Sequence, residues 1–214
     1  SFGINNKKSD IRFIKIKKNK KFYEIMVKQN DTRISFFTQN EFRNNIYNIL
    51  GALSVMSLFI DISSLKKNIF LNFKIPDGRG NISILNIDKK KIRLIDESYN
   101  SNPLSLKSAL LNYDNINSKK AKKFLLLGDM LELGNHSRKL HNSIVPIINK
   151  TNIDKVYVKG KNVSGIFNKI SKSKKGKILN NKSQIIELIK KDLDNNDYLM
   201  IKASNATGFN KIIK

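Results

Sequence analysis

Short apolar runs separated by polar turns fill the first third of this chain. β-Branched and aromatic residues cluster at positions 11–16, 22–27 and 33–37, with lysine, asparagine and aspartate between them. Such runs are typical of a small antiparallel sheet. A longer apolar stretch over 41–60 predicts a buried helix, and the segment 64–73 predicts a second, shorter one.

The pattern of apolar segments changes after a cluster of proline and glycine at positions 76–80. We therefore expect a first domain over 1–76 and a second over 77–214. Beyond the boundary, apolar strands alternate with helices. The predicted strands are 82–87, 92–96, 123–128, 155–160, 177–179 and 198–202, and the predicted helices are 103–113, 137–150, 163–172, 183–193 and 208–213. This alternation predicts an α/β fold with a doubly wound, mostly parallel sheet.

The composition adds a strong positive charge. With 41 Lys and Arg against 17 Asp and Glu, the formal net charge is +24. However, 35 Lys, 29 Asn and 31 Ile make up 95 of the 214 residues, whereas Arg occurs six times. This excess resembles a bias toward AT-rich codons, while surfaces that read bases favour the planar fork of Arg. We treat the charge as background and keep a nonspecific basic nucleic-acid-binding protein as an alternative function.

Few residues suited to metal or thiol chemistry are present. The chain has no Cys, which excludes disulfides, Cys-ligated zinc and thiol catalysis, and its two His make a His-based metal site improbable. The apolar stretch 46–60 is too short and too polar to span a bilayer. Residues 1–10 do not resemble a signal peptide. Because the sequence opens on Ser1 rather than Met, we expect it to continue a longer protein.

Polar residues gather directly after three predicted strands. The segment 96–102 follows one strand, Gly128 and Asp129 end a second, and Ser204 follows the last. Ligands of doubly wound sheets collect beyond the carboxyl ends of the strands, and the N-terminus of a helix over 208–213 could hold an anion. Asn-rich turns and helix caps would explain the same residues without a ligand, and both interpretations stay open here.

Two of these segments resemble signature blocks of the Mur ligase family, specifically of its MurF type. DESYNSNPLSLKSAL at 96–110 resembles D-[DE]-S-Y-N-A-N-P-x-S-M-x-A-A-L, and LLLGDMLELGNHSRKLH at 125–141 resembles L-G-D-M-x-E-L-G-x-x-S-x-x-x-H. Weaker matches are NNIYNILGAL at 44–53, DGRG at 77–80 and IKASNATGFNKII at 201–213, where Ala203 stands in place of the family's Gly. The resemblance covers essentially the whole chain.

The resemblance implies a set of site residues but no catalytic proton transfer and no metal ligand in this chain. The implied ATP-binding residues are Asn45 and Asn48 at the adenine, Arg79 at the phosphates, Asp96 or Glu97 at the ribose, and Tyr99. The implied region for D-alanyl-D-alanine comprises Asn100, Asn102, Asp129, Glu132, His141 and Ser204.

The resemblance also implies a reaction. Such a ligase uses ATP and Mg²⁺ to add D-alanyl-D-alanine to UDP-N-acetylmuramoyl-tripeptide through an acyl phosphate, in the cytoplasmic synthesis of peptidoglycan precursors. No G-x-x-x-x-G-K-[ST] motif occurs in the sequence. We therefore expect residues 1–76 to be the last part of an incomplete central ATP-binding domain, and the chain alone to be inactive. We expect a monomeric full-length form with no membrane and no specific nucleic-acid partner; a stand-alone ligand-binding module is a further alternative.

Overall fold

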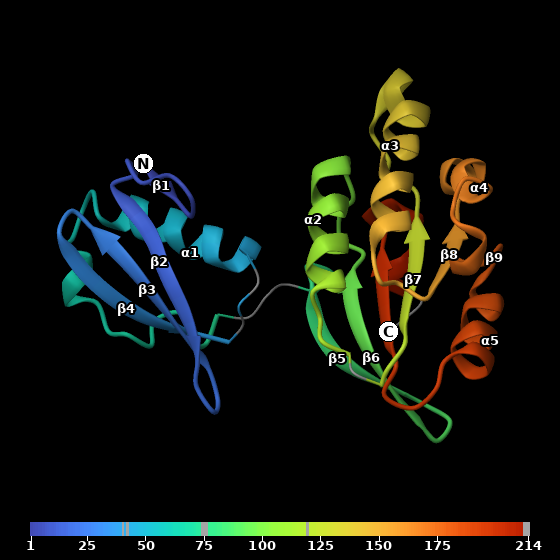
Figure 1. The fold of residues 1–214 in the computed structure, drawn as a ribbon, viewed down its shortest axis with the longest axis horizontal. Coiled ribbons are helices and arrows are strands. Elements are labelled where there is room, and N and C mark those ends of the chain that lie inside the picture. The colour runs from blue at the N-terminus through green and yellow to red at the C-terminus, as the bar shows by residue number, and fades with distance from the viewer. Residues whose placement is uncertain (40, 42, 74–76, 119, 212–214) are drawn as a thin grey trace. The chain divides into compact units, whose positions relative to one another are not determined.

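The computed structural model describes residues 1–39, 41, 43–73, 77–118 and 120–211. The chain divides into two compact units, 1–74 and 75–214 (Figure 1). The predicted boundary between residues 76 and 77 lies two residues beyond this division, and residue 76 itself is outside the described residues. Among the described residues, none of the helices has the length and apolarity needed to cross a membrane.

The first unit is a four-stranded sheet with one long helix packed on it. Its strands, in sheet order, are β1 (Phe2–Gly3), β2 (Ile11–Lys18), β3 (Tyr23–Gln29) and β4 (Thr32–Thr38). The predicted antiparallel sheet is confirmed by β2, β3 and β4, while β1 joins β2 in parallel. Ile25, Val27 and Phe36 form a core with Leu50 and Leu53 of helix α1 (Arg43–Met56).

The second helix predicted for this unit is wrong, and the first is shorter than expected. α1 ends at Met56 rather than at residue 60; Phe42, near its predicted start, lies outside the described residues. Of the segment 64–73, only its first residue is helical, in the 3₁₀ turn η1 (Ile62–Ser64). The carbonyl of Lys67 accepts a hydrogen bond from the backbone of Phe37 at 2.7 Å. A carbonyl engaged by a strand in this way supports an irregular path instead of an α-helix.

The second unit is built on a six-stranded sheet. Its strands are β5 (Asn81–Ile87), β6 (Lys90–Glu97), β7 (Lys123–Gly128), β8 (Lys155–Lys159), β9 (Lys175–Ile178) and β10 (Tyr198–Lys202). They lie in the order β5-β6-β10-β7-β8-β9. Only β5 runs antiparallel to its neighbour, so the predicted mostly parallel α/β sheet is confirmed.

Helices cover both faces of this sheet. Helices α2 (Pro103–Asp114), α3 (Ser137–Lys150) and α4 (Lys161–Phe167) contribute to one apolar core. Helix α5 (Lys182–Asp192) packs in a second core on the opposite face. Apolar side chains alternate between the two cores along the central strands: Leu125 and Leu127 belong to the first, Phe124 and Leu126 to the second. The sheet is thus doubly wound, as predicted.

Within the described residues, the helix predicted over 208–213 is limited to one 3₁₀ turn. Only a 3₁₀ turn, η5 (Phe209–Lys211), follows Gly208, whose φ is +76°. The preceding residues form another short turn, η4 (Asn205–Thr207). Residues 212–214 are outside the described part of the chain. Within the described residues, the anion site expected at the N-terminus of this helix therefore has only a single 3₁₀ turn behind it.

Candidate functional site

Three loops begin side by side at one edge of the six-stranded sheet. β6 and β7 each pair in parallel with the central strand β10. Lys202, the last residue of β10, consequently lies opposite Glu97 of β6 and Leu127 of β7. The polar segments that the sequence places after these strands thus share one edge, where doubly wound sheets bind their ligands.

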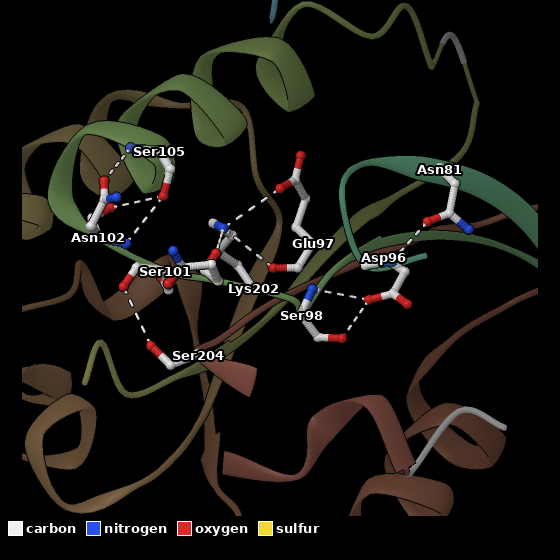
Figure 2. Close-up of polar contacts among 11 residues, drawn as sticks. Asn81, Asp96, Glu97, Ser98, Ser101, Asn102, Ser105, Lys202 and Ser204 are labelled. Carbon is white, nitrogen blue, oxygen red and sulfur yellow. Dashed lines mark hydrogen bonds and ion pairs between the residues drawn. The ribbon is translucent and has the colours of Figure 1, made fainter. Parts of the chain in front are cut away.

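The loop after β6 opens with a turn formed by Asp96. Its Oδ1 accepts hydrogen bonds from the backbone N–H of Ser98 at 3.0 Å and from the Ser98 hydroxyl at 2.6 Å (Figure 2). Asp96 is only 8% exposed, whereas Tyr99 and Asn100, beyond the turn, are exposed. Asp96 therefore shapes the loop, and Tyr99 and Asn100 face the solvent.

The same loop ends in a capped helix. Asn102 Oδ1 accepts a hydrogen bond from the backbone of Ser105 at 2.8 Å, and the Ser105 hydroxyl accepts one from the backbone of Asn102 at 3.1 Å. This reciprocal pair is a capping box, and Pro103 occupies the first helical turn, where its missing N–H is not needed. Both the Asn102 side chain and the helix start are thus fixed.

A glycine-rich turn at 77–80 packs against this loop. Gly78 has a φ of +75°, and a Cβ there would lie 2.8 Å from the backbone nitrogen of Tyr99. Gly80 has a φ of +91°, and its Cβ would lie 2.7 Å from Glu97 Oε1. Because both glycines allow this approach, the Arg79 guanidinium stacks on the Tyr99 ring, 4.3 Å from its centroid. Arg79 of the glycine-rich turn and Tyr99 of the loop after β6, both selected from the sequence, are therefore in contact.

Lys202 is a buried member of this site that the sequence analysis missed. It is 1% exposed, and its Nζ lies 3.5 Å from the carboxylate of Glu97. Burial lowers the pKa of Lys202 and raises that of Glu97, and each shift is opposed by the charge of the other residue. In a chain with 35 Lys, residue type alone could not single out this position. The available signals were a lysine ending an otherwise apolar strand, YLMIK, and its place in the weaker family match at 201–213.

Ser204 links the three loops. Its hydroxyl accepts a hydrogen bond from the backbone of Leu131, after β7, at 3.0 Å. The same hydroxyl donates to the carbonyl of Ser101, after β6, at 3.3 Å (Figure 2). The Ser101 side chain is itself buried, and its hydroxyl has no hydrogen-bond partner among the described residues. The edge of the sheet is thus a connected polar layer.

Asp129 is directed toward the start of α4. Its Oδ1 accepts a hydrogen bond from the backbone of Val163 at 2.8 Å, and its Oδ2 accepts one from Asn162 at 3.3 Å. Gly160, with a φ of +142°, makes room, because a Cβ there would lie 2.5 Å from Asp129 Cγ. The carboxylate therefore satisfies two N–H groups at a helix start.

His141 is also held by backbone groups. It is 1% exposed; its Nε2 accepts a hydrogen bond from the backbone of Met130 at 3.1 Å, and Nδ1 lies 2.8 Å from the carbonyl of Ser137. Contacts at both ring nitrogens fix the orientation of the imidazole. Glu132, between the two signature positions, is exposed and has a φ of +63°. Of the three residues selected in this block, Asp129, Glu132 and His141, Glu132 is thus the exposed one.

The two asparagines selected in α1 belong to the first unit and differ in environment. Asn45 is 5% exposed, and its Nδ2 donates a hydrogen bond to the Thr38 hydroxyl at 2.8 Å. Asn48 is exposed. Only Asn48 therefore presents its side chain to solvent.

A cavity of about 650 Å³ lies away from the three loops. It is lined by residues at the opposite edge of the sheet or next to it: Arg93, Asn117, Ser118, Lys120, Ala121, Asn195 and Asn196. The residues of the candidate site therefore do not line this cavity.

Comparisons with known proteins agree on one family. The family model described as "Mur ligase, glutamate ligase domain" matches residues 84–205. A curated UDP-N-acetylmuramoyl-tripeptide--D-alanyl-D-alanine ligase from Rickettsia prowazekii is 30% identical over 199 residues, which cover 91% of this chain and 40% of the relative. The enzyme of the same name from Bacillus subtilis is 28% identical over 58% of this chain and 27% of its own length.

Solved structures share the fold. MurF ligase from Thermotoga maritima, in complex with ADP, matches with a TM-score of 0.78 at 20% identity, over 99% of this chain and 46% of that one. MurF from Acinetobacter baumannii matches with a TM-score of 0.73 at 18% identity, over 99% of this chain and 45% of that one. The chain thus spans less than half the length of these relatives and structures.

Proposed function

The chain belongs to the Mur ligase family, and from this we propose that it is the C-terminal part of a MurF-type ligase. Such an enzyme joins D-alanyl-D-alanine to UDP-N-acetylmuramoyl-tripeptide with ATP, in peptidoglycan-precursor synthesis. The observation that carries the proposal is the meeting of both signature blocks and the strand β10 at one sheet edge, linked by Ser204 and Lys202. Cytoplasmic location and a monomeric full-length form are part of the same proposal.

The proposed reaction has two steps. The tripeptide carboxylate attacks the γ-phosphorus of ATP, which releases ADP and leaves an acyl phosphate. The free amine of D-alanyl-D-alanine then attacks the acyl carbon; a C–N bond forms, inorganic phosphate leaves, and the amine loses a proton to solvent. Both steps depend on close positioning of the reactants and on neutralisation of phosphate charge.

We propose that the phosphate-binding machinery lies outside these 214 residues. The sequence contains no P-loop motif, and the chain covers 40% of the Rickettsia relative. A P-loop and the residues that hold Mg²⁺ would come from a further segment or from a separate chain. On this proposal the 214 residues alone do not turn over ATP.

Within the chain, exposure suggests which residues reach the substrates. Arg79 and Tyr99 present a stacked guanidinium and ring suited to the nucleotide phosphates and sugar. Glu97, whose side chain is 20% exposed, is our choice over Asp96 for the ribose contact. Asn48 is likewise our choice over Asn45 for the adenine.

In the region proposed for D-alanyl-D-alanine, some residues contact the dipeptide and others hold the surrounding loops in place. Asn100 and Glu132 are exposed and suited to contact D-alanyl-D-alanine. The supporting residues, whose side chains bond to backbone groups of the loops and helix starts, are Asn102, Asp129, His141 and Ser204.

The experiment fuses this chain to the front part of a curated relative. Phosphate release and the amide product, detected by mass spectrometry, should appear only with ATP, Mg²⁺, the UDP-linked tripeptide and D-alanyl-D-alanine together. The Arg79→Ala fusion should show at least a tenfold higher KM for ATP. Its matched control is Arg93→Ala, because Arg93 stacks on Tyr198 at 4.9 Å near the opposite end of the strands and should change KM less than twofold. A folded wild-type fusion that forms no amide contradicts the proposed function.

A further inference from the structure

Lys202 has an unusual environment for a lysine. It ends the central strand β10 with 1% exposure, whereas lysine side chains are almost never fully buried unless they are paired. Its Nζ donates to the carbonyl of Glu97 at 3.2 Å and to the carbonyl of Asn100, and it lies 3.5 Å from the Glu97 carboxylate (Figure 2). An ammonium group has three N–H donors, so these contacts match its full capacity.

All three contacts fall within four residues of one loop. Glu97 lies inside the turn made by Asp96 and Ser98, and the exposed Tyr99 lies between Glu97 and Asn100. Because the ammonium bonds to main-chain carbonyls on both sides of Tyr99, it fixes the backbone that presents this ring to Arg79. The link spans more than a hundred residues of sequence, from β10 to the loop after β6.

Stability alone is a poor explanation for such a residue. Removing a lysine ammonium from water carries a large desolvation penalty, and well-packed apolar residues often replace buried ion pairs without loss of stability. A role in fixing geometry accounts for a charge in this position, with acceptors from a single loop.

We propose that Lys202 is a positioning residue for the ligase reaction, whose ammonium holds residues 97–100 so that Arg79, Tyr99 and Asn100 face the reacting substrates. This proposal rests on the proposed function for its catalytic part. Its structural part, the fixing of the loop, applies to the chain alone.

The chain offers a matched control. Lys123, the first residue of β7, is 4% exposed, and its Nζ donates to the carbonyl of Asp114 at 2.8 Å. It is a second buried lysine bonded to main chain, but it pairs with Tyr198 at the opposite end of β10. Lys202→Met and Lys123→Met therefore remove the same group from two ends of one sheet.

The first measurement is amide hydrogen exchange on the 214-residue chain. In Lys202→Met, the amides of residues 98–101 should exchange at least tenfold faster than in the wild type, while Lys123→Met leaves them within twofold. Lys202→Arg keeps the charge but lengthens and forks the donor group, so its exchange should lie between the other two. If Lys202→Met does not fold, Lys202→Arg carries the test. Unchanged exchange at 98–101 in a folded Lys202 variant would overturn the proposal.

The second measurement uses the ligase fusion. Displacement of a positioned group by about 1 Å can lower turnover about 100-fold, so we expect kcat/KM to fall 10- to 100-fold in Lys202→Met, with partial recovery in Lys202→Arg. Lys123→Met should stay within twofold of wild type at equal folded fraction. An active wild-type fusion in which the Lys202 and Lys123 variants have equal kcat/KM overturns the positioning role alone. A folded but inactive wild-type fusion instead overturns the proposed function and the catalytic part of this proposal, even if the exchange result holds.

Discussion

At the scale of single residues, two asparagines make the same helix cap in different places. Asn102 accepts a hydrogen bond from Ser105 at the start of α2, and Asn181 accepts one from Gln184 at the start of α5. Their loops follow β6 and β9, which are separated by three strands, or roughly 19 Å at the usual strand spacing. Asn102 and Asn181 thus share a structural role, but only Asn102 belongs to the candidate site.

We therefore expect Asn102→Ala and Asn181→Ala to lower the free energy of unfolding equally, by about 1 kcal/mol, because each removes one N-cap. In the ligase fusion, only Asn102→Ala should lower kcat, by about tenfold or more. Urea unfolding and steady-state kinetics check the two halves of this prediction. Equal kcat in both variants would mean that the loop is a structural turn and not part of an active site.

The pH dependence of stability should distinguish Glu97 from an ordinary carboxylate. Burial raises the pKa of Glu97 above its usual value of 4.5, although Lys202 and Arg79 oppose the shift and Asp96 adds to it. A raised folded-state pKa gives stability that is present below the unfolded value and lost as pH rises through the folded value. Wild type should therefore lose stability relative to Glu97→Gln as pH rises from about 4 to 7.

Glu187→Gln is the control for Glu97→Gln, because the pKa of Glu187 is shifted in the opposite direction. Lys191 lowers the pKa of the exposed Glu187 by a hydrogen bond and by its charge, so this carboxylate stabilises the fold above its unfolded pKa and loses that effect in acid. Relative to Glu187→Gln, wild type should therefore gain stability as pH rises. Urea unfolding at several pH values measures both differences, and parallel trends for the two variants would contradict the assignment.

Residues inside the two signature blocks and the glycine-rich turn could be selected from sequence, whether exposed or buried, but the pairing between distant strands could not. Arg79, Tyr99 and Asn102 stand in recognisable motifs, and Pro103 marks the helix that Asn102 caps. Lys202 stands in the weaker match at 201–213, but its role depends on a strand neighbour 105 positions away, which the sequence does not reveal.

At the scale of elements, the end of β7 shows how tightly one strand is fitted to its neighbours. A Cβ on Gly128 would lie 2.6 Å from Cβ of Ala203 and 2.5 Å from Cε2 of Phe209. Ala203, directly after β10, stands where the family pattern has Gly. Its methyl group fits because the facing residue at the end of β7 is Gly128. The two positions should therefore be coupled energetically.

Gly128→Ala should lower the free energy of unfolding by about 1–3 kcal/mol, because overpacking a filled core forces its neighbours to move. Ala203→Gly should recover part of this loss in the double variant. As a control, Gly165→Ala in α4 has open space around its Cβ and should be neutral or stabilising by up to about 1 kcal/mol. Urea unfolding of the four variants tests the cycle, and additive effects of Gly128→Ala and Ala203→Gly would contradict it.

Most elements of the second unit were predictable, since strands with continuous apolar residues alternate with helices of clear period. The segment 64–73 was mispredicted because its apolar residues serve tertiary contacts: Leu65 and Phe70 pack on the core of the first unit, and Lys67 bonds to β4. Gly208, the first residue of the predicted final helix, has a positive φ and lies between the turns η4 and η5. The local sequence pattern revealed neither these tertiary contacts nor the positive φ of Gly208.

At the scale of the whole molecule, sequence order conceals the arrangement that builds the site. The last strand, β10, inserts between β6 and β7 at the centre of the sheet. The alternation of strands and helices predicts parallel pairing but leaves this order open. Insertion of β10 brings Lys202 and Ser204 to the two signature loops, and so the site is complete only once the C-terminal strand is in place.

The net charge of +24 is also a property of the whole molecule, and it allows the nucleic-acid alternative to be tested. Lysines release counterions from phosphates but present no planar fork to base edges, so any DNA binding should be independent of sequence. If six or more phosphates are contacted, affinity should fall about 10³-fold or more between 50 and 200 mM salt, with equal slopes for AT-rich and GC-rich duplexes. Fluorescence anisotropy with both duplexes across this range measures the slopes. Binding that stays selective for one duplex at physiological salt would contradict the treatment of the charge as background and would favour a nucleic-acid-binding function.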